Sequence, residues 1–179
     1  MANADFSRIC IRSATTEDAT QLAILRYQFR SELATPMESQ AAFVTRAIQW
    51  FRTHLGTENW RAWVAEAGTA QLVGHLFAQF IEKIPNPIVE AEMLVYLTNF
   101  YVISSMRGQG IGERILQAAL AECEKAEVDS IILWPTEKSI PFYQRYGFAK
   151  PAKLMELPWK CYNEDSAMNP APPSRGLHY

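Results

Sequence analysis

The stretch Arg107-Gly108-Gln109-Gly110-Ile111-Gly112 decides the fold, because it joins two segments of different periodicity. Before it, residues 94–103 (LVYLTNFYVI) are apolar, β-branched and aromatic, which predicts a strand with much of its surface buried. After it, apolar residues recur at helical spacing over about residues 110–128, with charged residues on the other side. The glycines therefore lie in a turn that leads from a buried strand into an amphipathic helix.

This glycine turn is suited to bind an anion. Glycine allows backbone angles that a Cβ atom would forbid, and it lets a ligand approach the main chain closely. The first N–H groups of the helix have no partner within it and carry the positive end of its dipole, so phosphate is the expected ligand. The run does not fit the G-x-x-x-x-G-K-[ST] of a P-loop or the G-x-G-x-x-G of a dinucleotide site. A tight structural turn without a ligand is the alternative.

A second motif follows the turn in the order that one protein family shows. The turn reads Arg-x-x-Gly-x-Gly, and residues 141–148 (PFYQRYGF) lie downstream of it. With both motifs, the chain resembles the GNAT superfamily of N-acetyltransferases over roughly residues 9–159. The resemblance implies an α/β (α+β) class, with a mixed, mostly antiparallel central sheet, flanking helices and splayed central strands.

The order of elements predicted from the sequence agrees with that fold. Strands are expected at 9–12, 60–67, 71–83, 94–103, 130–134 and 152–159, and helices at 16–33, 39–56, 110–128 and 139–146. Ser39 is expected to cap the second helix, and Gly147 to end the last one in a left-handed conformation. We expect one domain over residues 1–159, followed by a proline-containing tail over residues 160–179.

The composition is that of an ordinary globular chain. Of its 179 residues 49% are hydrophobic and 20% charged, and the formal net charge is −2. Neither nucleic acid nor a membrane surface is therefore an expected partner. The three cysteines show no ligand spacing, so no metal is expected. The N-terminus lacks a signal-peptide pattern and no stretch reaches the about 18 apolar residues of a membrane span, so we expect the cytoplasm.

The resemblance implies acetyl-coenzyme A (acetyl-CoA) as the acetyl donor. In the family, the glycine turn wraps the pyrophosphate and the pantetheine arm lies against the end of the preceding strand. The residues this assigns to the cofactor are Phe100, Tyr101, Val102, Arg107, Gly108, Gln109, Gly110, Ile111, Gly112, Glu113, Thr136 and Phe142. Thr136 departs from the pattern, because many members have an asparagine at that position.

The resemblance also implies a catalytic acid, Tyr143, which protonates the departing thiolate. A phenol has a pKa of about 10, close to that of a thiol, so this proton transfer is nearly balanced. The alternative is that Tyr143 is a core aromatic residue. Some members place a glutamate on the central strand as the base, but the corresponding position here is Leu97. The base is left open between water and three carboxylates near the preceding loop, which are Glu82, Glu90 and Glu92.

Three functions remain open from the sequence. The first is an N-acetyltransferase that moves the acetyl group from acetyl-CoA to a primary amine of a small molecule by direct attack. The same chemistry on a protein N-terminus or a lysine is the second. A non-catalytic domain that binds acyl-CoA is the third, suggested by the missing glutamate at Leu97. Homodimers are frequent in the family, so a homodimer is compatible with each.

Overall fold

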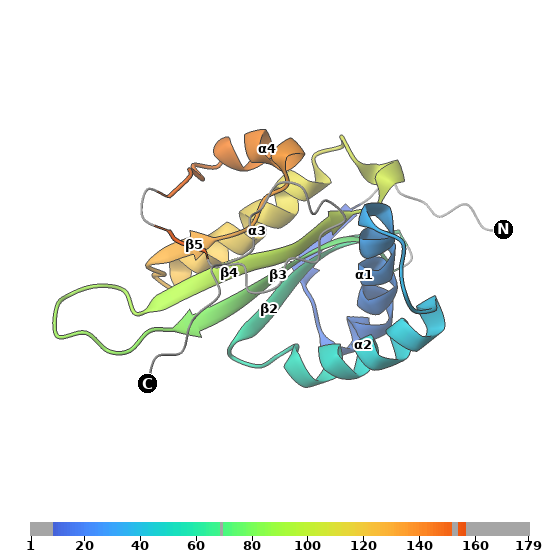
Figure 1. The fold of residues 1–179 in the computed structure, drawn as a ribbon, viewed down its shortest axis with the longest axis horizontal. Helices are drawn as coiled ribbons and strands as arrows, with labels where there is room; N and C mark the ends of the chain where they lie inside the picture. The colour runs from blue at the N-terminus through green and yellow to red at the C-terminus, as the bar shows by residue number, and fades with distance from the viewer. Residues whose placement is uncertain (1–8, 69, 152–153, 157–179) are drawn as a thin grey trace, which may run out of the picture. The chain divides into compact units, whose positions relative to one another are not determined.

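The computed structural model describes residues 9–68, 70–151 and 154–156 (Figure 1). The chain forms two compact units, Met1–Pro135 and Thr136–Tyr179. In the described part of the chain, no helix is both long enough and apolar enough to cross a membrane.

A five-stranded sheet organises the first unit, in the order β1-β2-β3-β4-β5. Its strands are β1 (Ile9–Ser13), β2 (Trp60–Ala67), β3 (Gln71–Glu82), β4 (Met93–Val102) and β5 (Ser130–Ile132). The first four pair in antiparallel fashion, whereas β5 lies parallel to β4. The sheet is therefore mixed and mostly antiparallel, which confirms the expected fold class.

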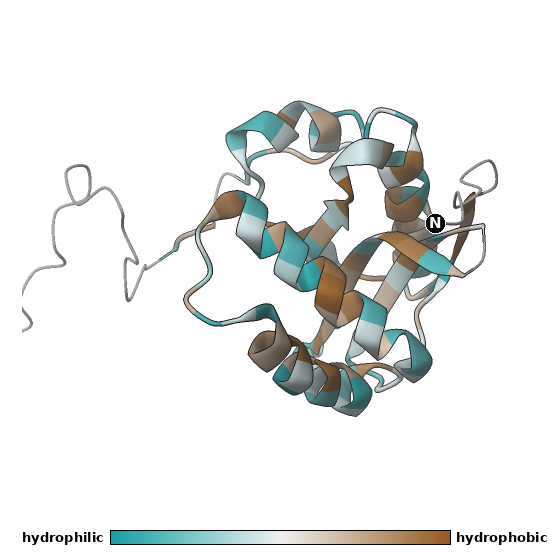
Figure 2. Cartoon of the chain, turned by 90° about the vertical axis from the view of Figure 1, so that its right-hand side faces the viewer, coloured by the Kyte–Doolittle hydropathy of each residue, from teal (hydrophilic) through white to brown (hydrophobic). Residues whose placement is uncertain are grey.

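Three helices cover the two faces of this sheet, namely α1 (Ala19–Leu33), α2 (Gln40–His54) and α3 (Ile111–Lys125). Figure 1 shows α1 and α2 together on one face and α3 on the other. In Figure 2 these helices carry both hydrophobic and hydrophilic residues, as expected where one side faces a sheet and the other faces solvent. The core on the α1 and α2 face includes Leu22 and Phe51 from the helices.

The expected cap of the second helix is confirmed. The Ser39 hydroxyl accepts a hydrogen bond from the Ala42 N–H at 3.3 Å, which caps α2. The first helical turn of the chain is a 3-10 helix, Thr16–Asp18, in which Thr15 and Asp18 form a capping box. The carboxylate of Asp18 also accepts two hydrogen bonds from Arg12 at 2.8 Å, which ties the start of α1 to β1.

The second unit, described by itself, is short. A 3-10 helix (Glu137–Ser139) leads into α4 (Ile140–Gln144). Gly147 follows with φ +84°, so it has the expected left-handed conformation. The aromatic rings of this segment contact one another, with centroid separations of 5.3 to 5.6 Å among Phe142, Tyr143, Tyr146 and Phe148.

Several predicted boundaries differ from the structure. The helix expected to reach Val128 ends at Lys125, because Glu127 has a left-handed backbone with φ +49°. The strand expected over 130–134 ends at Ile132. Most of the strand expected over 152–159 lies outside the described residues, and its described part, residues 154–156, is not in a strand. The tail over 160–179 also lies outside them.

Candidate active site

The glycine turn connects β4 to α3 through a short 3-10 helix, Ser104–Met106. Gly108 and Gly110 both have left-handed backbones, with φ +76° and +75°. Other L-residues lose about 1–2 kcal/mol in this conformation, so the path of the chain favours glycine at both positions. Gly110 is the N-cap of α3, and no side chain caps the helix. The first N–H groups of α3 therefore emerge at the turn without a capping side chain.

The space beside this turn is open. A Cβ atom built on Gly108 or on Gly110 meets no atom within 4 Å. A ligand can therefore approach the backbone there at van der Waals distance. Together with the uncapped helix N-terminus, this open cradle fits a negatively charged diphosphate.

The third glycine has a different role. Gly112 lies in the first turn of α3, and a Cβ atom there would lie 3.5 Å from Cζ of Phe100. The ring of Phe100 therefore packs closely against the start of the helix. This contact places the end of β4 beside the turn that follows it.

Arg107 holds the turn in place through its side chain. Its Nε donates to the Val102 carbonyl at 2.8 Å, and its Nη2 donates to Glu32 of α1 at 2.6 Å. The Tyr101 hydroxyl donates to the other oxygen of Glu32 at 2.7 Å. Burial and this carboxylate raise the pKa of Tyr101 to about 12. The guanidinium that the family resemblance assigns to the cofactor is thus bonded to α1 and β4.

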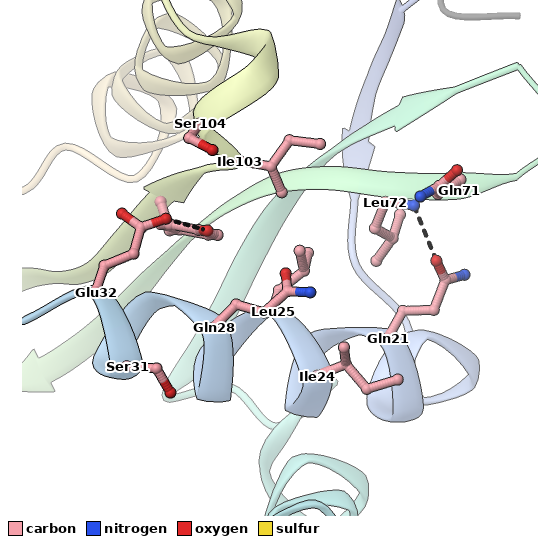
Figure 3. Close-up of a pocket in the computed structure, with 11 residues that line it drawn as sticks. Gln21, Ile24, Leu25, Gln28, Ser31, Glu32, Gln71, Leu72, Ile103 and Ser104 are labelled. Carbon is pink, nitrogen blue, oxygen red and sulfur yellow. Dashed lines mark hydrogen bonds between the residues drawn. The ribbon is translucent and has the colours of Figure 1, made fainter. Parts of the chain in front are cut away.

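The Tyr101–Glu32 bond lines one end of a groove of about 590 Å³. Figure 3 shows Gln28, Ser31 and Glu32 on α1 and Ile103 and Ser104 across the groove. The other end is fixed by Gln21, whose Oε1 accepts from the Leu72 N–H at 2.9 Å. The residues lining this groove do not include the glycines, so it is separate from the cradle.

The C-terminal part of β4 is not paired with β5. β5 pairs with β4 only from Leu94 to Tyr96. The predicted cofactor residues Phe100, Tyr101 and Val102 lie beyond the last of these pairs. On this side, β4 therefore forms no ladder with β5 at these residues, as expected for the splayed strands that the resemblance implies.

A bulge interrupts β4 just before these residues. Tyr101 pairs with His75 but Thr98 pairs with Phe77, so β4 carries one additional residue. Asn99 lies in the bulge with φ +53°, a conformation that asparagine tolerates better than most residues. The sequence analysis did not predict this bulge, although an asparagine within a run of strand-forming residues is a signal that could have indicated it.

Two side chains brace the bulge. The Nδ1 atom of His75 lies 2.7 Å from the Asn99 carbonyl oxygen, and Nη1 of Arg26 donates to the Asn99 Oδ1 at 2.7 Å. His75 is fully buried, and this burial lowers its pKa to about 4, so the ring is neutral and Nδ1 carries the proton. Its Nε2 has no hydrogen-bond partner among the described residues. Sequence reasoning did not find this brace.

Tyr143 lies on α4 in the second unit. Its ring makes edge contacts with Phe142 and Phe148. Burial raises the pKa of Tyr143 to about 12, so the phenol keeps its proton throughout the physiological range. Thr136 lies in the same unit, where its hydroxyl donates to Ser139 Oγ at 3.1 Å and thereby helps form the local turn.

The three candidate bases lie at the opposite end of β4 from the cofactor residues. Glu90 pairs with Lys83 at 3.3 Å, and Glu92 accepts from the backbone N–H of Asn86 at 3.1 Å. A strand rises about 3.3 Å per residue, so Glu92 is about 25 Å along the chain from Phe100. Leu97, within the strand, is only 2% exposed. Of the other expected cofactor residues, Gln109 lies in the glycine turn, and Ile111 and Glu113 lie in the first turn of α3.

No group of three or more potential metal ligands occurs among the residues that the structure describes.

Comparisons with known proteins agree with this geometry. A family model described as an acetyltransferase (GNAT) domain matches residues 58–150. A predicted acetyltransferase from Clostridium acetobutylicum, solved with acetyl-CoA, is 23% identical, with a TM-score of 0.69 over 84% of this chain and 96% of that chain. A GCN5-related N-acetyltransferase from Ralstonia eutropha is 24% identical, with a TM-score of 0.67 over 84% and 98%. No curated protein matches the chain.

A third similar structure is the glucosamine-6-phosphate N-acetyltransferase from Arabidopsis thaliana. It is 17% identical, with a TM-score of 0.63 over 86% of this chain and 99% of that chain. At these identities the solved structures show a shared fold.

Proposed function

The chain belongs to the GNAT acetyltransferase family, and on that basis we propose that it is an N-acetyltransferase that uses acetyl-CoA and acts on a primary amine of a small molecule. The observation that carries the proposal is the open cradle at Gly108 and Gly110 ahead of α3. The family match runs across the boundary between the two units, which supports our expectation that residues 1–159 form one domain.

In this proposal, acetyl-CoA is bound mainly by backbone groups of the chain. The N–H groups at Gly110, Ile111 and Gly112 would bind the pyrophosphate, and the β4 edge at Phe100–Val102 would bind the pantetheine arm. When bound, acetyl-CoA supplies the acetyl group as a reactive thioester. Arg107 acts indirectly in this scheme, because its bonds to Val102 and Glu32 hold the turn in position.

Tyr143 would supply the proton to the departing sulfur. The neutral amine nitrogen forms a bond to the carbonyl carbon, the carbon–sulfur bond breaks, and the sulfur takes the phenolic proton. The nitrogen then releases its surplus proton to solvent, and the Tyr143 phenolate takes up a proton from solvent, which restores the acid. With a pKa of about 12, the Tyr143 phenol would not readily protonate a thiolate in water, because the thiol is the stronger acid. Burial, however, raises the pKa of a thiol as well. Cys123 illustrates this, because burial raises the pKa of its thiol to about 11. In a site that excludes water the two pKa values are therefore close enough for transfer.

Water would take the proton from the amine. Leu97 occupies the place of the glutamate that some members use, and Glu90 and Glu92 are held in the loop before β4. Glu32, which lies beside Tyr101, is already bonded to Tyr101 and Arg107, so in this proposal the acceptor loses its proton to solvent before it attacks. The rate should therefore rise with pH until the free amine predominates.

The proposal is tested by thiol release from acetyl-CoA in the presence of a panel of amines. Tyr143→Phe should lower kcat about 100-fold or more, which is the usual contribution of a positioned acid. Tyr146→Phe is the matched control, because it removes a neighbouring phenol, and it should retain most of the activity. Equal rates for wild type and Tyr143→Phe would remove Tyr143 from this role.

The same assay separates the alternative functions. Turnover with peptides or proteins but not with small amines would make the chain a protein acetyltransferase. Tight binding of acetyl-CoA without transfer to any acceptor would make it a non-catalytic binding domain.

A further inference from the structure

Arg26 is a half-buried arginine whose described contacts include no acidic side chain. It projects from α1 toward β4, where it donates to Asn99 Oδ1, and its Cζ lies 5.7 Å from the centre of the Phe29 ring. No carboxylate among the described residues forms an ion pair with it. The half-buried Arg12, by contrast, pairs with Asp18 and Glu66.

Arg30 adds a second positive charge one helical turn further along α1. Its side chain is exposed and likewise has no ion pair within the described part of the chain. It lines a pocket of about 290 Å³, whose other lining residues are Tyr27, Ala34, Thr35, Pro36, Met37, Glu38 and Phe43. The acidic residue of this lining, Glu38, pairs with Arg46 of α2 instead. The pocket between α1 and the α1–α2 connection therefore presents an uncompensated positive charge.

This arrangement favours the binding of an anion. Like charges four residues apart on a helix repel each other, and withdrawing a charge from water without pairing it costs further energy. Burial first, and the charge of Arg30 second, lower the pKa of Arg26 to about 10. A bound carboxylate or phosphate would relieve both effects. The planar guanidinium group, with its five N–H donors, matches the oxygen spacing of either group.

We infer that the acceptor amine carries a negatively charged group, a carboxylate or a phosphate, and that Arg26 and Arg30 bind it. This inference rests on the proposed acetyl transfer. Arg26 reaches the bulge at Asn99, directly before Phe100, where the cofactor strand begins. An acceptor anchored by Arg26 would therefore have its amine beside the strand on which the thioester is expected to lie. The two arginines determine specificity, because they select amines that also carry an anion.

Binding calorimetry with free coenzyme A present tests this inference without requiring turnover. Two pairs of amines are compared: phosphoethanolamine with ethanolamine, and phenylalanine with phenethylamine. In at least one pair, the anionic member should bind with a Kd at least about tenfold lower than that of the neutral member. A tenfold change in Kd is what the loss of one hydrogen bond to a charged group would cause. The pair that shows the preference identifies the anion as phosphate or carboxylate.

Three variants test whether Arg26 and Arg30 cause the preference for anionic amines. Arg26→Gln and Arg30→Gln should each reduce it to less than about threefold, and Arg30→Gln changes only an exposed residue, so its folding is not at issue. Arg52→Gln on α2 removes one exposed positive charge and is the matched control, which should keep the preference of wild type.

Equal affinity within each pair, no binding by any of the four amines, or a preference that survives both variants would overturn the inference. Acetylation of the neutral amines at the same rate as the anionic ones would also overturn it, while leaving acetyl transfer intact. A preference that depends on Arg26 and Arg30, without acetylation of any amine, would support the anion site and refute the proposed function.

Discussion

Gly110→Ala should have a small effect on the stability of the protein and a large effect on its binding of acetyl-CoA. Gly110 has φ +75°, and an alanine in this conformation costs about 1 kcal/mol. No atom lies within 4 Å of the added Cβ, so no clash adds to this cost. For a chain of this length, the melting temperature should fall by about 2–4 °C.

The same methyl group projects into the open space where the diphosphate is expected. It would hold the phosphate away from the N–H groups of Ile111 and Gly112. Hydrogen bonds to a charged group contribute about 1.5–3 kcal/mol each, so losing two weakens binding of acetyl-CoA by at least about 100-fold. Calorimetric titration of folded protein measures this directly.

Gly56→Ala is the matched control. Gly56 follows α2 with φ +85°, and its Cβ would also meet no atom within 4 Å. It should lose the same stability but bind acetyl-CoA as wild type does. The reasoning is refuted if Gly110→Ala is folded and binds acetyl-CoA within about threefold of wild type, a difference of less than 1 kcal/mol.

Three other predictions concern packing and pH. Gly74→Ala should destabilise the chain by about 2 kcal/mol in chemical denaturation, because its Cβ would lie 2.9 Å from the Tyr101 carbonyl oxygen; unchanged stability would contradict this. Burial alone would raise the pKa of Asp18, but hydrogen bonds from Arg12 and Thr15 outweigh it and keep the pKa below the ordinary value. Asp18→Asn should thus lower the free energy of unfolding by about 2 kcal/mol at neutral pH. Chemical denaturation should show this full difference from wild type above about pH 4 and a smaller one as the pH falls further; a difference that does not change with pH would refute this. With the pKa of Tyr143 at about 12, kcat should show no fall at high pH up to about pH 10, and a fall that Tyr143→Phe abolishes would contradict the assigned pKa.

The sequence predicted most of the fold because its signals are local. Alternation and helical spacing identified the strands and helices, and glycine identified the left-handed turn ahead of α3. Their ends were less certain, since periodicity continues beyond the last hydrogen-bonded pair. Trp134 illustrates this: it lies beyond β5 and is exposed, although it continues the apolar run.

The braces around the candidate site could not be predicted from the sequence. The bond between Arg107 and Glu32 joins residues far apart in the chain, and it depends on how α1 crosses the sheet. The same holds for Arg26 and Asn99, because nothing in their local sequence indicates that they meet. Long-range pairing of this kind is set by packing, which propensity and periodicity do not encode.

Transfer of a labelled acetyl group tests the central claim most directly. The protein is incubated with acetyl-CoA labelled with ¹³C in the acetyl group and with a primary amine, and the amine is examined by mass spectrometry. We predict that the labelled acetyl group appears on the amine nitrogen in proportion to the protein added, and that Gly110→Ala and Tyr143→Phe greatly reduce it. Acetyl-CoA that binds but stays intact, with every amine tested left unlabelled, would contradict the claim.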